Sequence, residues 1–128
     1  MRKTVLLVDD DPEVLELLSF NFKKAGFAVL HAADGLQAIT KAGSLSPHLI
    51  VLDLMMPELD GFAVLELLRK DPATASIPVI MLTAISGQMA RLNALEAGAS
   101  QFVTKPFSPH QLVSTAEELL GLAPFSPS

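Results

Sequence analysis

Five short strand-like runs alternate with five stretches of helical spacing along the chain, and this alternation constrains the fold most strongly. The clearest runs, residues 5–8 and 49–52, contain only apolar residues. Continuous apolar runs of this length are typical of strands covered on both faces of a parallel sheet. Parallel strands need crossover connections, which usually contain a helix and are right-handed. The sequence therefore predicts an α/β fold: a five-stranded parallel sheet in the order 2-1-3-4-5 with helices on both faces, the flavodoxin-like doubly wound (βα)5 arrangement.

Capping residues divide the 128-residue chain into these ten elements. Asp11, Asp34 and Ser108 each precede helical spacing and fit the N-cap position, whereas Gly26 and Gly98 fit helix ends. The expected strands are residues 5–8, 27–31, 49–52, 77–82 and 101–104. The expected helices start near residues 12, 35, 61, 88 and 109, and the second of them ends near residue 42.

The third apolar run ends abruptly in a carboxylate, Asp53, and Pro57 four residues later cannot continue a strand's hydrogen-bond ladder. Asp53 is therefore expected at the carboxyl end of the central strand. In open α/β sheets, ligands bind at this edge, at the point where the strand order reverses. Taken alone, an Asp after a strand is as easily a residue that caps a loop.

Polar residues also follow three other strands: Asp9 and Asp10 after the first, Thr83 after the fourth and Lys105 after the fifth. Asp11 is explained by its N-cap position before a proline, but its two preceding neighbours are not. Because the carboxyl ends of parallel strands share one edge, we expect all these side chains to converge on one crevice. The alternatives are ordinary: helix-end acids for the two aspartates, a turn residue for Thr83 and a surface lysine for Lys105.

This set of side chains predicts a magnesium site and phosphoryl transfer. Adjacent carboxylates raise one another's pKa unless a cation lies between them, and hard oxygen ligands without His or Cys suit Mg²⁺. A carboxylate nucleophile, Mg²⁺ and a lysine are what phosphoryl transfer to an aspartate requires, because fixed cations must neutralise the charge on the phosphoryl oxygens. Thr83 can donate a hydrogen bond to the same oxygens.

The motifs at these strand ends resemble those of the receiver domain of bacterial two-component response regulators, and the resemblance extends from Lys3 to about Leu122. It implies that Asp53 accepts a phosphoryl group from a histidine kinase or a phosphotransfer protein. The motifs are Val8-Asp9-Asp10, Asp53-Leu54-Met55-Met56-Pro57 with Asp60-Gly61, Thr83-Ala84, and Phe102-Val103-Thr104-Lys105-Pro106-Phe107.

The resemblance also implies a role for each residue at the site. Asp10 and Asp53 would ligate Mg²⁺ together with the backbone carbonyl of Met55, and Asp9 would hold a metal-bound water. Lys105 would pair with the phosphoryl group and precede a cis peptide bond. The switch residues would be Thr83, which moves toward the phosphoryl group, and Phe102, which turns inward behind it.

Two other functions fit the same predicted fold. A pseudo-receiver that only binds partners is expected to lack one of the acids or Lys105, and none is missing here. A magnesium-dependent aspartyl-phosphate phosphatase resembling haloacid dehalogenases would carry a second acid two residues after its nucleophile, where this chain has Met55. We therefore expect no enzyme in the usual sense, only a domain that catalyses its own phosphorylation and dephosphorylation.

The net charge and the distribution of apolar residues indicate which classes of partner and which cellular location to expect. The formal net charge is −5 and the basic residues form no stripe, so we expect no direct nucleic-acid binding by this chain. No apolar run approaches the roughly 20 residues of a membrane span, and no signal peptide is recognisable, which predicts a cytoplasmic protein without membrane contact. We assign residues 1–122 to the receiver domain and residues 123–128 to a linker-like tail.

The expected output face consists of the fourth helix, the fifth strand and the fifth helix, and it would contact a downstream protein or domain. In the fourth helix we expect Leu92 and Leu95 to face inward. Receivers that pair winged-helix DNA-binding domains carry complementary charges on this face, including an Arg-Glu pair that opens the last helix. Here those places hold Ser100, Gln101, His110 and Gln111, while the last helix offers Glu117 and Glu118. Without those salt bridges, we expect mainly monomer.

Overall fold

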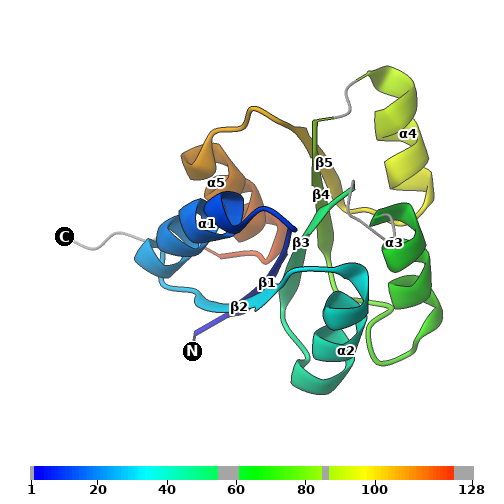
Figure 1. The fold of residues 1–128 in the computed structure, drawn as a ribbon, viewed down its shortest axis with the longest axis horizontal. Coiled ribbons are helices and arrows are strands. Elements are labelled where there is room, and N and C mark those ends of the chain that lie inside the picture. Colours follow the sequence, from blue (N-terminus) through cyan, green and yellow to red (C-terminus); the bar gives the residue numbers. More distant parts are fainter. Residues whose placement is uncertain (1, 55–60, 85–86, 123–128) are drawn as a thin grey trace.

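The computed structural model describes residues 2–54, 61–84 and 87–122, and these form a five-stranded parallel sheet with helices on both faces (Figure 1). The strand order is β2-β1-β3-β4-β5, which confirms the predicted fold and its switch point between β1 and β3. In chain order the elements are β1 (Thr4–Val8), α1 (Pro12–Lys24), β2 (Ala28–Ala32), α2 (Gly35–Leu45), β3 (Leu49–Asp53), α3 (Gly61–Lys70), β4 (Val79–Thr83), α4 (Gln88–Glu96), β5 (Gln101–Thr104) and α5 (Pro109–Leu119).

Helices α1 and α5 cover one face of the sheet, and α2, α3 and α4 cover the other (Figure 1). Alternate residues of each central strand enter the two resulting cores. In β3, for example, Val51 packs with Phe22 of α1, whereas Ile50 and Leu52 pack with Leu65 of α3. Every residue of β3 and β4 is buried, as expected for strands covered on both faces. Polar side chains on these strands can therefore reach solvent only at or beyond the strand ends.

The predicted N-caps are all observed. Asp11 accepts a hydrogen bond from the backbone N–H of Glu13 at 2.9 Å, and Asp34 accepts one from the N–H of Gln37 at 2.8 Å. The hydroxyl of Ser108 accepts from a backbone N–H in the first turn of α5 at 3.3 Å. Each bond satisfies a donor that would otherwise lack a partner in the first turn of its helix.

The expected inward position of Leu92 and Leu95 in α4 is wrong, because these side chains are 44% and 38% exposed. The residue of α4 that is buried is Ala94, and Ala90 and Ala97 pack beside the core. A stripe of alanines at helical spacing thus faces the sheet, so α4 lies close to it and its larger apolar residues point outward. Smaller differences are that α2 continues to Leu45 and that β4 begins at residue 79.

Arg69, near the end of α3, connects three separate segments through its guanidinium group. Its Nε and Nη2 donate to the carbonyl oxygen of Gly98 at 3.1 and 2.9 Å, and its Nη1 donates to the carbonyls of Ile77 and Ala75 at 2.7 and 3.2 Å. Burial lowers the pKa of Arg69 from its ordinary value. These contacts hold the loops before β4 and before β5 against the end of α3.

The predicted tail, residues 123–128, lies outside the described residues, so the boundary at 122 stays a prediction. Within the described parts of the chain, none of the helices has the length and apolar character needed to cross a membrane.

Replacing Asp34 by Ala is expected to lower the free energy of unfolding by about 1 kcal/mol, because the cap on the Gln37 N–H is lost. Asp34→Asn is the matched control and should stay within a few tenths of a kcal/mol of wild type, since Asn caps as well as Asp. Urea denaturation of the three proteins measures both differences. An equal loss in both variants would show that charge, and not the cap, accounts for the effect.

Candidate functional site

The register of the sheet brings the predicted site residues to one edge. Val8 pairs with Leu52, so the next residues of the two strands, Asp9 and Asp53, lie level with each other at the carboxyl ends of β1 and β3. On the other side of β3, Asp53 pairs with Leu82 of β4. The crevice therefore forms where the strand order reverses, and the last residue of β3 lies at its centre.

Three carboxylates meet in this crevice. One oxygen from each of Asp9, Asp10 and Asp53 lies within 4.8 Å of the others. Asp9 and Asp53 are 2% and 5% exposed, whereas Asp10 is exposed to solvent. The Oδ1 atom of Asp9 accepts a hydrogen bond from the backbone N–H of Asp11 at 2.9 Å, which fixes this carboxylate against the start of α1. The predicted convergence of the three acids is observed.

Lys105 supplies positive charge to the crevice. Its Nζ atom lies 3.1 Å from Oδ2 of Asp9 and 3.5 Å from Oδ2 of Asp53. Burial by itself lowers the pKa of Lys105, but the hydrogen bond to Asp9 and the charges of Asp53 and Asp9 outweigh it, so the pKa is raised above its ordinary value. The lysine is therefore charged at neutral pH. The peptide bond from Lys105 to Pro106 is cis, as the resemblance implied.

The backbone of Lys105 is held at the end of β4. The backbone N–H of Lys105 donates to the carbonyl oxygen of Thr83 at 2.7 Å, and Thr83 pairs with Thr104 in the sheet. Thr83 is fully buried at the end of β4. Thr83 and Lys105 are thus held together at the carboxyl ends of β4 and β5, and these strands lie on the opposite side of β3 from β1 and Asp9.

The donor set fits a hard divalent cation. Three carboxylates face one ammonium, so negative charge is in excess when all four groups are ionised. Carboxylate oxygens and water are the ligands that Mg²⁺ prefers, and exposed Asp10 leaves that side of the cluster open to water. The predicted further donor, the carbonyl of Met55, lies outside the described residues and stays a prediction.

Phe102, the expected switch aromatic, is 5% exposed and belongs to the core cluster on the α4 side of the sheet. The carbonyl of Phe102 accepts a hydrogen bond from Nη1 of Arg91 in α4 at 3.5 Å. The ring therefore already lies inward in this structure. Its movement together with Thr83 stays a prediction.

The close packing around Gly61 was not predicted from the sequence, where this residue was assigned only to a family motif and to the turn before the third helix. The N–H of Gly61 donates to the carbonyl of Leu54 at 2.7 Å. A Cβ atom here would lie 2.6 Å from the carbonyl oxygen of Asp53 and 2.6 Å from Cα of Leu54, both backbone atoms. Only glycine lets the first residue of α3 approach the backbone that carries Asp53 so closely. The available signal was the Asp60-Gly61 pair, which by sequence alone indicates only a turn.

Comparison with known proteins gives a consistent result. Residues 5–117 match the family model of the response regulator receiver domain. The chain is 41% identical over 116 residues to the DNA-binding dual master transcriptional regulator RpaA of Synechocystis sp., covering 91% of this chain and 48% of that protein. It is 39% identical over 120 residues to the alkaline phosphatase synthesis transcriptional regulatory protein PhoP of Bacillus subtilis, covering 94% of this chain and 49% of the relative.

The chain thus spans about half the length of these curated relatives. The expected lack of direct nucleic-acid binding is not supported by a relative named as DNA-binding, although the match covers only part of that protein. Among solved structures, the chain resembles the receiver domain of the Francisella response regulator 1452, with a TM-score of 0.89, 32% identity, and coverage of 94% and 98% of the two chains. It also resembles the Vibrio cholerae chemotaxis protein CheY4, with a TM-score of 0.87, 30% identity, and coverage of 92% and 98%.

Replacing Gly61 by Ala is expected to lower the free energy of unfolding by about 1–3 kcal/mol, because a methyl group would overlap backbone atoms that cannot move aside cheaply. Gly43→Ala is the matched control, since no atom lies within 4 Å of its added Cβ and the residue is inside α2. The free energy of unfolding of Gly43→Ala should rise by about 0.5–1 kcal/mol. Urea denaturation measures both. Equal stabilisation by the two alanines would contradict the close approach at Gly61.

Proposed function

This chain belongs to the response regulator receiver domain family, and from that premise we propose that Asp53 accepts a phosphoryl group in a magnesium-dependent reaction and thereby changes a protein contact face. The donor is a phosphohistidine of a histidine kinase or of a phosphotransfer protein. The observation that carries the proposal is the position of Asp53: buried at the end of the central strand, with carboxylates on one side and Lys105 on the other.

Asp53 is better placed as the nucleophile than the other two acids. Asp9 is tied to the start of α1 through the N–H of Asp11, which fixes the direction of its carboxylate. Asp10 is exposed, so water surrounds its carboxylate and weakens the effect of nearby charges on it. Asp53 ends the strand that lies between β1 and β4, where it meets both the acids of β1 and the ammonium of Lys105.

The transfer step follows from this placement. A carboxylate oxygen of Asp53 attacks phosphorus, the P–N bond of the phosphohistidine breaks, and its electron pair remains on the imidazole nitrogen. Lys105, which now neutralises Asp9 and Asp53, moves its ammonium group onto the new phosphoryl oxygens. Asp9, Asp10 and Asp53 would hold Mg²⁺, which when bound supplies charge neutralisation for the transferring phosphoryl group.

The output follows from the two residues beyond the crevice. Thr83 lies at the end of β4 and Phe102 lies on the neighbouring strand, next to α4. A phosphoryl group on Asp53 would draw the hydroxyl of Thr83 toward it. The inward ring of Phe102 would fill the space that Thr83 leaves. The α4–β5–α5 surface is thereby remodelled and binds a downstream protein or domain. Relatives named as transcriptional regulators support an effector of that kind.

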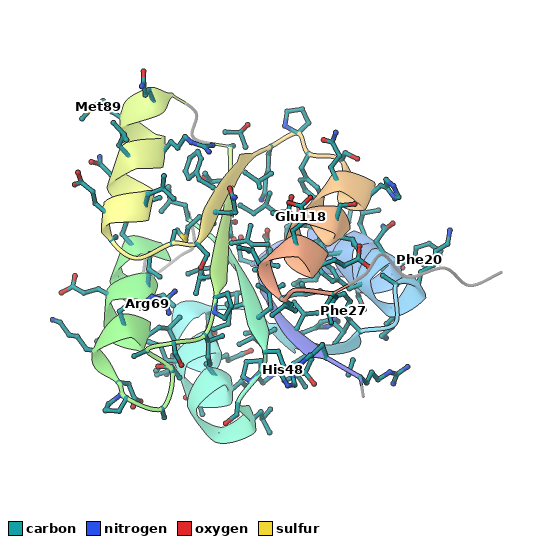
Figure 2. The ribbon with its side chains drawn as sticks, turned by 180° about the vertical axis from the view of Figure 1, so that it is seen from behind. Phe20, Phe27, His48, Arg69, Met89 and Glu118 are labelled. Atoms are coloured by element: carbon teal, nitrogen blue, oxygen red, sulfur yellow. The ribbon has the colours of Figure 1, made fainter. Side chains whose placement is uncertain are left out.

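The surface itself differs in two ways from the sequence prediction. Glu117 is buried at 7% exposure, so α5 presents Glu118 rather than both acids (Figure 2). Met89, at the N-terminal end of α4, is 68% exposed and continues the outward apolar stripe with Leu92 and Leu95 (Figure 2). The face is therefore more apolar and less charged than expected. It suits a protein partner, and it carries His110 and Gln111 at the places where receivers that form a charge-paired dimer carry an Arg-Glu pair.

Incubation with Mg²⁺ and acetyl phosphate is expected to add one phosphoryl group per chain, on Asp53, because the crevice supplies the nucleophile and both cationic positions. Intact-protein mass spectrometry measures the stoichiometry. Asp53→Asn should take up none. Asp10→Ala and chelation of Mg²⁺ should each reduce labelling by at least about 10-fold, because the dianionic donor then lacks the neutralising metal charge. Phosphorylation of the Asp53→Asn variant, or full labelling with chelator, would contradict the proposal.

Sedimentation of the beryllofluoride-activated chain at micromolar concentration is expected to show mainly monomer, because His110 and Gln111 replace the Arg-Glu pair that specifies the charge-paired receiver dimer. Leu92→Glu is the control for association through the apolar stripe and should leave the result unchanged. A wild-type dimer that this substitution dissociates would contradict the expectation and would assign the stripe to self-association.

A further inference from the structure

Helix α3 contacts the phosphorylation site at its first residue. Gly61 donates its N–H to Leu54, the residue directly after Asp53, and lies against the carbonyl oxygen of Asp53 with no room for a methyl group. Any displacement of the Asp53–Leu54 backbone therefore acts directly on the start of the helix. Val64, Leu65 and Leu68 are buried along its length, so α3 responds as one packed unit and not by bending.

The other end of α3 holds the end of α4. Arg69 donates two hydrogen bonds to the carbonyl of Gly98, which lies two residues after the end of α4. The backbone of Gly98 has a φ of +108°, and a Cβ there would lie 3.0 Å from Cγ and Nε of Arg69. The side chain and the glycine thus fit against each other closely, and the contact includes both charge-assisted hydrogen bonds and packing.

The rest of α4 is held more weakly. Its N-cap is Gly87, which has no side chain to cap the helix, and Ala94 is the residue of the helix that is buried. In its first half, Arg91 donates to the carbonyl of Phe102 at 3.5 Å, a longer hydrogen bond than the two that Arg69 makes to Gly98. Figure 2 shows Met89 at the far end of α4 from Arg69. The C-terminal end of α4 is therefore the more firmly held end, and Arg69 connects it to α3.

We propose that α3 is a second connection between Asp53 and α4, with Gly61 as its contact at the site and Arg69 as the residue that positions the C-terminal end of α4. The inference rests on the proposed phosphorylation of Asp53. It is separate from the action of Thr83 and Phe102, which reach α4 through β4 and β5. Arg69 is a positioning residue, since its hydrogen bonds go to loop carbonyls and not to the carboxylates of the crevice.

The guanidinium connects α3 to two loops at once. Its donors are divided between Gly98 on one side and Ala75 and Ile77 on the other, so a shift of α3 would change the hydrogen bonds to both loops together. Packed contacts of this kind tend to change between discrete arrangements and do not deform continuously. A shift at Gly61 can thus be passed to the loop before β5.

The test is an NMR titration of the full chain with Mg²⁺ and beryllofluoride, following backbone amides in three proteins: wild type, Arg69→Gln and Lys70→Gln. Lys70 is the matched control, because it is the next residue and forms an exposed ion pair with Glu66. In Arg69→Gln, the shifts induced at the amides of Gly98 and Ala99 should fall by roughly two-fold or more. The shifts at Lys105 and Phe102 should persist, and Lys70→Gln should match wild type.

Arg69→Lys provides a variant that keeps the charge and removes the fork that reaches both loops, and it is used if Arg69→Gln does not fold. It should show the same selective loss at Gly98 and Ala99. Undiminished shifts there in either folded variant overturn the inference while leaving the proposed function intact. Loss of response at Lys105 as well would also overturn it, because Arg69 would then be supporting the site as a whole. A wild-type protein that shows no response at Lys105 refutes the proposed function and this inference with it.

Discussion

The crowding of three carboxylates at the end of a fully buried strand is the constraint on which the rest of the structure depends. Asp9 and Asp53 have almost no access to water, and like charges held this close oppose folding unless a cation neutralises them. Lys105 supplies one positive charge at 3.1 and 3.5 Å from these two acids. Its ion pairs link the residue that follows β5 to the ends of β1 and β3, so the same contacts that stabilise the sheet edge form the carboxylate-rich crevice on which the proposed phosphorylation depends.

The apolar strands place the carboxylates and the ammonium group together at one edge of the sheet. Because β3 and β4 are buried over their whole length, their polar positions lie at the strand ends, and the parallel arrangement puts all the carboxyl ends on one edge. Asp53 occupies the centre of that edge and has a neighbouring strand on each side. One residue can therefore meet carboxylates that follow β1 and an ammonium that follows β5 without any long loop to bring them together.

The strands, the N-caps and the convergence of the described site residues on one edge were predictable because each depends on local chemistry or on the shared edge of a parallel sheet. Asp34 caps the helix it precedes, and Asp9 lies level with Asp53 once the strand order is known. The contacts of Arg69 were not predictable, since its partners are the carbonyls of loops that only the fold brings near. The predicted orientation of α4 was wrong for a different reason. This helix carries alanines and leucines at overlapping helical spacings, and periodicity alone does not show which set packs against the sheet.

The packing of α4 through alanines also bears on whether this helix can change position. A helix packed through leucines would lose much burial if it moved, whereas α4 contacts the sheet through small residues and leaves Leu92 and Leu95 partly in solvent. Fewer buried apolar contacts mean a smaller free-energy difference between two positions of the helix, which places it among the less stable parts of a fold. A phosphoryl group can bias an equilibrium only by as much as it interacts differently with the two states. A helix packed through small residues and held at its C-terminal end by Arg69 is thus the kind of element that the proposed phosphorylation of Asp53 would need in order to change the contact face.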